Sequence, residues 1–184
     1  MGHQNEIIIA QTKQWLKDIV IGLNFCPFAK PVFEQEKIHY QVSAADSLEA
    51  CLQDLIAEAE RLDNQSELET ILVIYPNCVQ DFDDFLELLE IANDLMHAQA
   101  YEGVYQLASF HPEYCFSGSD AEDPANYTNR SPYPMLHLIR ESSLALALEN
   151  YKDPEKIPDT NVQVAQDLGL EKMQELLAEV MKKK

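Results

Sequence analysis

The stretch Ile71-Leu72-Val73-Ile74-Tyr75 is a run of five apolar residues, and it decides the fold class of this chain of 184 residues. A strand with one face in water alternates apolar and polar residues, so an uninterrupted run is typical of a strand covered on both faces. The run is also far too short to cross a lipid bilayer. It therefore predicts a buried strand of a sheet that has helices on both sides.

Segments with apolar residues at helical spacing lie before and after this run. Residues Leu48 to Leu62 place apolar side chains on one face, with Asp46 as the predicted N-cap and Glu49 completing a capping box. A second helix is expected from about Asp81 to His97. Alternating residues predict a strand over residues 38–42, and a third strand is expected over residues 104–110. Strands and helices thus alternate, which is typical of an α/β protein with a small, mainly parallel β-sheet and crossover helices.

The N-terminal part of the chain adds a helix and a loop to this core. Apolar residues at helical spacing predict an amphipathic helix from Ile7 to Val20, which Gly22 and Asn24 end. Pro27 and Pro31 then interrupt an apolar segment over residues 24–31, which we expect to be an ordered, irregular loop.

The C-terminal half begins with a long ordered loop after the third strand, over residues 111–131. Ser131 is then expected to cap a helix that extends to about Glu149, because Pro132 and Pro134 are tolerated in a first helical turn. Two shorter helices follow, over residues 159–168 and 170–181. They form a helical C-terminal segment, and without a repeat or a clear linker we expect a single α/β domain over residues 1–184.

Composition excludes several classes of function. Acidic residues outnumber basic ones by 32 to 13, giving a formal charge of −19, so the surface repels phosphate backbones and nucleic acid is not an expected partner. The start of the chain lacks the basic region of a secretory signal, so we expect a cytoplasmic protein with no membrane association. The four cysteines form no Cys-x-x-Cys pair and are expected to be free thiols. Oligomeric state is left open.

The predicted topology points to a site at one edge of the sheet. Ligands of open parallel sheets gather at the carboxyl ends of the strands, and His111 directly follows the third strand there, while Asn77 and Cys78 follow the second. His111 is a candidate general acid or base, although a lone histidine is more often hydrogen-bonded scaffolding. The long loop leaves from the same edge, and its aromatic residues favour an ordered structure over disorder.

Two of the three arginines of the chain lie in this region. Arg130 and Arg140 are candidates for binding a carboxylate or phosphate through paired guanidinium donors, with Asn129 beside them. The competing interpretation pairs each arginine with an acidic neighbour, such as Asp120 or Asp123 for Arg130. On the expected helix, His137, Arg140 and Glu141 share one face, so His137 is a further candidate for substrate binding.

The thiol of Cys26 is the candidate nucleophile, with a buried structural cysteine as the alternative. A zinc site would require Cys26, Cys78, His111 and Cys115 to converge, and their spacing matches no standard zinc pattern, so we expect no metal. The chain has five glycines and lacks a P-loop and a Gly-x-Gly-x-x-Gly motif. Backbone cradles for nucleotides are therefore not expected, and the cofactor is unknown.

Three strings carry a family resemblance: Gly22-Leu-Asn-Phe-Cys-Pro-Phe-Ala29, Tyr105-Gln-Leu-Ala-Ser-Phe-His-Pro112 and Asn126-Tyr-Thr-Asn-Arg-Ser-Pro-Tyr-Pro134. They resemble a bacterial family known as domain of unknown function 1415. The resemblance runs from the first helix to Gly169 and includes Leu136-His137-Leu138 and Arg140-Glu141. It implies no activity, substrate or cofactor. It places Cys26, His111, Asn129, Arg130, His137 and Arg140 in the strings typical of the family.

Two hypotheses on function follow. In the first, the protein binds, and as an enzyme acts on, a small anionic metabolite held by Arg130 and Arg140, with His111 and Cys26 as catalytic groups. In the second, the protein is a non-catalytic interaction module whose 111–131 loop contacts a partner protein. The first predicts a pocket that holds these side chains together. The second predicts internally paired arginines and an exposed apolar patch on the loop.

Overall fold

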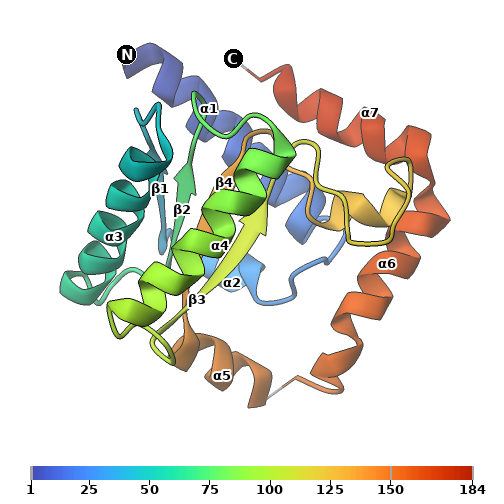
Figure 1. Cartoon of the computed structure of the whole chain (residues 1–184). Coiled ribbons are helices and arrows are strands. Elements are labelled where there is room, and N and C mark those ends of the chain that lie inside the picture. Colours follow the sequence, from blue (N-terminus) through green and yellow to red (C-terminus); the bar gives the residue numbers. More distant parts are fainter. Residues whose placement is uncertain (1, 150, 184) are drawn as a thin grey trace.

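The computed structural model describes residues 2–149 and 151–183 and shows a mixed α/β fold (Figure 1). Its elements in chain order are α1 (Gly2–Trp15), the π-helical turn η1 (Leu16–Ile21), α2 (Ala29–Glu34), β1 (Ile38–Val42), α3 (Leu48–Asn64), β2 (Thr70–Ile74), α4 (Phe82–Ala98), β3 (Tyr105–Phe110), the 3-10 turn η2 (Pro124–Thr128), β4 (Met135–Arg140), α5 (Glu141–Glu149), the short turn η3 (Pro154–Lys156), α6 (Ile157–Leu168) and α7 (Leu170–Met181).

The sheet has the strand order β1-β2-β4-β3 and is mixed, so the prediction of a mainly parallel sheet is wrong. β1 and β2 are parallel, while β4 pairs antiparallel with both β2 and β3. The predicted strand β3 does point in the same direction as β2, but β4 inserts between them. The sheet is mixed because Met135–Arg140, a segment expected to be helical, forms the antiparallel strand β4.

The error at β4 has a local origin. Residues 131–140 were assigned to a helix that begins at Ser131, yet Met135 to Arg140 forms a strand and the helix α5 begins only at Glu141. Along β4 the side chains alternate between the two faces of the sheet, so His137 and Arg140 point to opposite sides. The prediction that His137, Arg140 and Glu141 share a helix face is therefore wrong.

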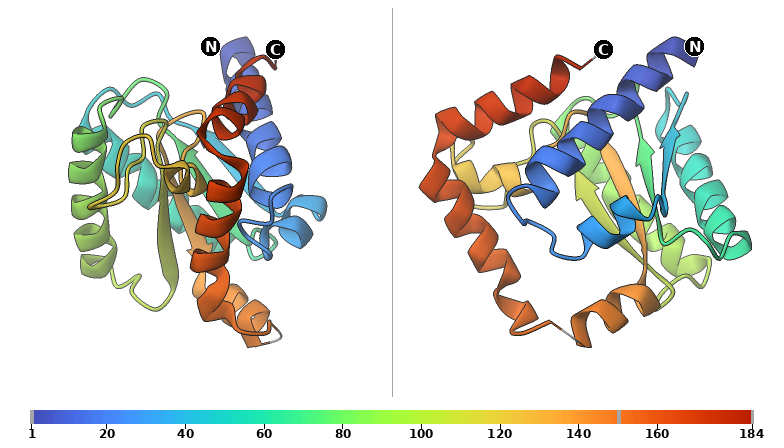
Figure 2. Two further views of the ribbon diagram at one scale, coloured as in Figure 1. Left: turned by 90° about the vertical axis from the view of Figure 1, so that its right-hand side faces the viewer. Right: turned by 180° about the vertical axis from the view of Figure 1, so that it is seen from behind.

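Helices cover both faces of the sheet, as Ile71 to Tyr75 predicts (Figure 2). α3 and α4 pack on the face that carries Ile71 and Val73, in a core with Leu55, Leu62, Phe85, Leu88 and Leu138. α1, η1, α6 and α7 pack on the other face, against Leu72 and Ile74. All five residues of β2 are buried. None of the helices that the structure describes combines the length and apolar composition needed to span a bilayer.

Smaller differences from the sequence expectations concern helix ends. α3 is capped by Ser47 rather than Asp46, because the hydroxyl of Ser47 accepts a hydrogen bond from the backbone N–H of Ala50. The apolar loop after α1 is shorter than expected, since α2 begins at Ala29 and includes Pro31 within its first turn. The residue directly after η1 must be a glycine, because a Cβ atom at position 22 would lie 2.2 Å from the carbonyl oxygen of Asp18.

Candidate functional site

The edge at which β2 and β3 end holds His111, as predicted. Its Nε2 lies 3.1 Å from the carbonyl oxygen of Val79 in the turn after β2. Its Nδ1 accepts a hydrogen bond of 3.0 Å from the backbone N–H of Glu113, so the proton of the neutral ring is on Nε2, which donates to Val79. Both ring nitrogens are therefore engaged within the protein.

His111 also lies in an aromatic environment that favours its neutral form. It is fully buried, with its ring centre 5.2 Å from that of Phe82 and 5.0 Å from that of Phe85, both on α4. Burial lowers the pKa of His111 below 6.5, although the carbonyl of Val79 opposes this shift. This geometry supports His111 as a residue that fixes the turn after β2 to the long loop, and it supports a general-base role poorly.

Arg130 binds the long loop from within. Its Nε donates to the carbonyl oxygen of Tyr114 at 3.0 Å, and a terminal nitrogen donates to that of Ala121 at 2.9 Å. Its guanidinium group also lies 4.7 Å from the centre of the Tyr127 ring. Asp120 and Asp123, expected as alternative partners, instead accept hydrogen bonds from Glu122 and Ala125 within the loop. The guanidinium group thus holds the 111–131 loop closed.

Arg140 lies at the other end of β4 and makes a different set of contacts. Its guanidinium group donates to backbone carbonyls at the end of α3 and just after it, on Leu62, on Gln65 at 3.2 Å and on Leu68 at 2.8 Å. The length of β4, roughly 20 Å for six residues, separates the two arginines. They do not converge on one ligand in this structure.

Three of the six predicted site residues do come together, on the face of the sheet opposite α3 and α4. Cys26 and His137 both line a cavity of about 260 Å³ between β4, α2 and α5. Cys26 and Asn129 both line a neighbouring cavity of about 380 Å³. We call these two cavities, which share Cys26 as a wall, the Cys26 hollow.

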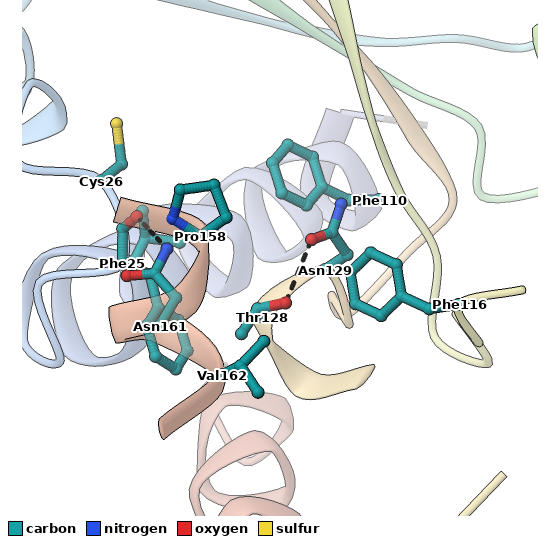
Figure 3. A pocket seen from close by; sticks show the side chains of 10 residues that line it. Phe25, Cys26, Phe110, Phe116, Thr128, Asn129, Pro158, Asn161 and Val162 are labelled. Atoms are coloured by element: carbon teal, nitrogen blue, oxygen red, sulfur yellow. Dashed lines mark hydrogen bonds between the residues drawn. The ribbon is translucent and has the colours of Figure 1, made fainter. Parts of the chain in front are cut away.

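The larger cavity lies where four segments of the chain meet (Figure 3). In Figure 3, Phe110, Phe116 and Asn129 lie on one side and Pro158 and Asn161 on the other. Asn161, on α6, donates a hydrogen bond of 2.6 Å to the carbonyl oxygen of Phe25, which ties α6 to the loop of Cys26. Asn129 donates to the carbonyl oxygen of Ser109 at 3.1 Å. A primary amide has two N–H groups, and the bond just described engages one of them on each side chain.

The smaller cavity is lined mainly by apolar side chains, and its polar lining residues include His137, Thr70, Glu69 and Ser143. The hydroxyl of Thr70 donates to the carbonyl oxygen of Leu138 at 2.6 Å, so its lone pairs accept the Nε2–H of His137. This assigns the acceptor role of the ring to Nδ1. Burial lowers the pKa of His137 to about 4, so the ring is uncharged at neutral pH.

Cys26 is a protonated thiol in this environment. Burial raises the pKa of Cys26, while the backbone N–H groups of Phe28 and Ala29 oppose the shift without reversing it. A nucleophilic cysteine needs the opposite shift, toward the thiolate at neutral pH. In Figure 3 its sulfur points away from Asn161. Cys26 is thus placed as a wall residue between the two cavities.

Several wall residues of the hollow were not singled out from the sequence. Thr70 and Asn161 lie 67 and 24 positions from His137, so pattern within a segment carries no signal that joins them. Phe116 counted in the sequence only as an aromatic residue that favours an ordered loop, and Phe110 only as the end of the third strand. Thr128 stands in the Asn126–Pro134 string and lines the larger cavity beside Asn129.

The residues considered for zinc do not form a metal site in the part of the chain that the structure describes. There, no three or more His, Cys, Asp or Glu side chains are grouped so that they could hold an ion. Cys26 lines the hollow on one face of the sheet, whereas Cys78 packs against the core on the other face.

The fold and the hollow together define a mixed α/β protein with two adjoining cavities beside its sheet. The chain belongs to the family described as protein of unknown function (DUF1415), which matches residues 7–175. This confirms the resemblance carried by the three sequence strings. No curated protein and no solved structure matches the chain.

Proposed function

We propose that this protein binds a small, uncharged molecule in the Cys26 hollow. The observation that carries the proposal is the convergence of Cys26, His137 and Asn129, from three separate segments, on cavities of about 380 and 260 Å³. Small-molecule sites are typically concave, mostly apolar and fitted with a few polar groups that fix the orientation of the ligand. The hollow has this composition: most of its walls are apolar, and the amides of Asn129 and Asn161 are among its polar groups, with Thr70 and His137.

The charges around the hollow support an uncharged ligand over the anion expected from the sequence. Among the residues that line the two cavities, Glu69 alone has an ionised side chain at neutral pH, and it is paired with Lys37 at 3.2 Å and with Ser143. Arg130 and Arg140 bind backbone carbonyls elsewhere. An anion in the hollow would lose water without gaining a cationic partner, which is unfavourable.

The protonation states support binding more than catalysis. A cysteine nucleophile paired with a histidine base works through a thiolate and an imidazole that accepts its proton. Here burial raises the pKa of Cys26 and lowers the pKa of His137 to about 4, so both groups favour their neutral forms. We therefore propose a binding site and assign no reaction to it.

A second candidate function, contact with a partner protein through the 111–131 loop, is favoured by one observation. Phe116 is 36% exposed on that loop. Its neighbour Tyr114, however, packs against Phe116 at 5.0 Å and against Phe82 at 5.3 Å between ring centres. Phe116 also lines the larger cavity, so its exposure is explained by the hollow as well as by contact with a partner protein.

The test uses a neutral environment-sensitive naphthalene dye and its anionic sulfonate analogue as probes. Val162→Trp fills the larger cavity from α6, and Leu86→Trp places the same side chain at an exposed position of α4 on the other face of the sheet. We expect the neutral dye to bind the wild type more tightly than the anionic one. Val162→Trp should weaken it by about tenfold or more, and Leu86→Trp should leave it unchanged.

Two results would contradict the proposal. One is equal binding of the neutral dye by Val162→Trp and the wild type, and the other is tighter binding of the anionic dye. Circular dichroism of each variant separates loss of binding from loss of folding. If Val162→Trp does not fold, Ala147→Phe tests the smaller cavity from α5 in the same way.

A further inference from the structure

Cys51 and Cys78 form a pair of thiols on the face of the sheet away from the Cys26 hollow. Cys51 lies in the first turn of α3 and is fully buried, whereas Cys78 is half-buried in the turn after β2. Cys51 belongs to the core of α3 and α4 and Cys78 packs against the same core, and the thiol of Cys78 is near enough to raise the pKa of Cys51, although the two residues are 27 positions apart in sequence. The hydroxyl of Tyr75 donates to the carbonyl oxygen of Cys51 at 3.2 Å, which joins this turn of α3 to the end of β2.

The turn that carries Cys78 is held in a strained conformation. Val79 is β-branched and has a φ of 50°, a left-handed conformation that such residues rarely adopt. It is kept there by burial and by the hydrogen bond from His111 to its carbonyl oxygen. Gln80 in addition donates to the carbonyl oxygens of Tyr75 and Cys78. Cys78 is therefore fixed beside Cys51, and the surrounding contacts keep it there.

We infer that Cys51 and Cys78 are a site of oxidative modification, at which a peroxide converts the two thiols to a disulfide. Cys78 reacts first because solvent reaches it, and Cys51 then resolves the product. The pair lies apart from the proposed ligand site, so the inference does not depend on the proposed function.

The chemistry balances with one peroxide for each disulfide. The thiolate of Cys78 attacks one peroxide oxygen, the O–O bond breaks, and the sulfur becomes a sulfenic acid while the other oxygen leaves as hydroxide and takes up a proton. The sulfur of Cys51 then attacks the sulfur of Cys78. The S–O bond breaks, the proton of Cys51 leaves with the hydroxyl group as water, and the S–S bond forms. Two thiols lose two electrons in total, and hydrogen peroxide becomes two molecules of water.

The burial of Cys51 fits the second role. Burial raises the pKa of Cys51, and the neighbouring thiol of Cys78 raises it further, so Cys51 is a poor first nucleophile. It is also shielded from a dissolved peroxide because its side chain is fully buried. A nearby sulfenic acid on Cys78 removes this limitation, since the attack is then intramolecular.

The experiment exposes the full-length protein to hydrogen peroxide, blocks the remaining thiols by alkylation and maps the peptides after cleavage at glutamates. This cleavage separates Cys78 from Cys115, because Glu102 and Glu113 lie between them. We expect the wild type to lose two of its four titratable thiols and to yield a peptide pair that joins Cys51 to Cys78. Cys115→Ser should give the same linked pair, and Cys78→Ser should give none.

The inference is overturned if Cys78→Ser loses thiols as the wild type does, or if the linked pair joins other cysteines. It is also overturned if Cys78 passes to the sulfinic acid while Cys51 remains free. Cys78→Ser replaces a half-buried loop side chain and avoids the fully buried position 51, and a thermal melt of the reduced variant checks its folding.

Discussion

Arg140 was a candidate for ligand binding, but its guanidinium group donates hydrogen bonds to backbone carbonyl oxygens. The last carbonyls of a helix have no partner within it, and those of α3 are met by a guanidinium group from β4. A cation at this position also complements the negative end of the helix dipole. The same fork geometry that suits a carboxylate suits several carbonyls, so arginine alone does not identify an anion site.

Replacing Arg140 with Lys should lower the free energy of unfolding by about 2 kcal/mol, because an ammonium group cannot meet carbonyls on Leu62, Gln65 and Leu68 together. Arg130→Lys is the matched comparison and should cost about 1 kcal/mol, since Arg130 binds two carbonyls of a half-exposed loop. Urea unfolding measures both. An anion-binding role predicts the reverse, namely unchanged stability with loss of ligand.

His137 should make the protein sensitive to acid. Its pKa is 6.5 when unfolded and about 4 when folded, so below pH 6.5 the unfolded chain binds the proton first. Stability is therefore complete above pH 6.5 and is lost as the pH falls toward 4, by about 2 kcal/mol between pH 7 and pH 5. His137→Gln keeps a donor for Thr70 and should remove this part of the loss in urea unfolding at the two pH values.

The control for this prediction is His3→Gln, because the side chain of His3 is exposed in α1. It should leave the difference between pH 7 and pH 5 as in the wild type. His111 is buried and His39 is half-buried, and burial lowers the pKa of both, so part of the acid sensitivity remains in His137→Gln. An unchanged difference in His137→Gln would show that His137 does not supply it.

At the scale of elements, the segments with a long local signal were predictable and β4 was not. α3 and α4 each repeat an apolar face over 17 residues, so their periodicity is unambiguous. β4 has six residues, and Met135-Leu136-His137-Leu138-Ile139 is a run too short to separate helix from strand by spacing. Its hydrogen bonds go to β2 and β3, which lie far away in sequence, so nothing local records them.

The candidate site shares this limit. The strings that contain Cys26, Asn129 and His137 could be singled out from the sequence, and the hollow does join these three residues. Their grouping depends on β4 being a strand, because only then does His137 face the same side of the sheet as Phe110. The sequence correctly places His111 at the end of β3. The hydrogen bonds of its ring with Val79 and Glu113 could not be predicted, because they depend on the conformation of the turn after β2 and of the long loop.

The start of α3 provides a test at this scale, because sequence and structure assign its cap differently. Ser47→Ala removes the acceptor for the N–H of Ala50 and should lower the free energy of unfolding by about 1 kcal/mol. Asp46→Ala, at the residue expected from the sequence, should change it by less than about 0.5 kcal/mol. Chemical denaturation of the two variants decides between them. A larger loss for Asp46→Ala would restore the sequence assignment.

At the scale of the whole molecule, the helices cover the second face of the sheet, on which the hollow lies, unevenly. α1 and α7 pack over the side of β1 and β2, where Gln11 of α1 donates to the carbonyl oxygens of Met181 and Lys183. Over β3 the cover is incomplete, since Gln106 is exposed and Ala108 is half-buried. The ribbons of α5 and α6 surround this side of the sheet (Figure 2). The larger cavity of the hollow borders this region at Phe110, whereas the smaller cavity lies against Leu72 of β2 and His137 of β4.

The two cores share β2, and we therefore propose that the chain unfolds as one cooperative domain. Leu72 and Ile74 belong to the core with α1, while Ile71 and Val73 belong to the core with α3, so neither core can open without disturbing the same strand. Trp15, 1% exposed and hydrogen-bonded to the carbonyl oxygen of Arg130 at 3.0 Å, reports on the first core by fluorescence. Far-ultraviolet circular dichroism reports on all helices.

We expect the two signals to give the same urea midpoint and the same slope, because one transition exposes both cores. A tryptophan in the other core, in the double variant Trp15→Phe/Phe85→Trp, should again coincide with the circular dichroism of that variant, even if its midpoint is lower. Two separate midpoints would instead indicate that the layer of α1, α6 and α7 unfolds independently of α3 and α4. The Cys26 hollow would then lie at the boundary between two units, and ligand binding would stabilise mainly the transition that Trp15 reports.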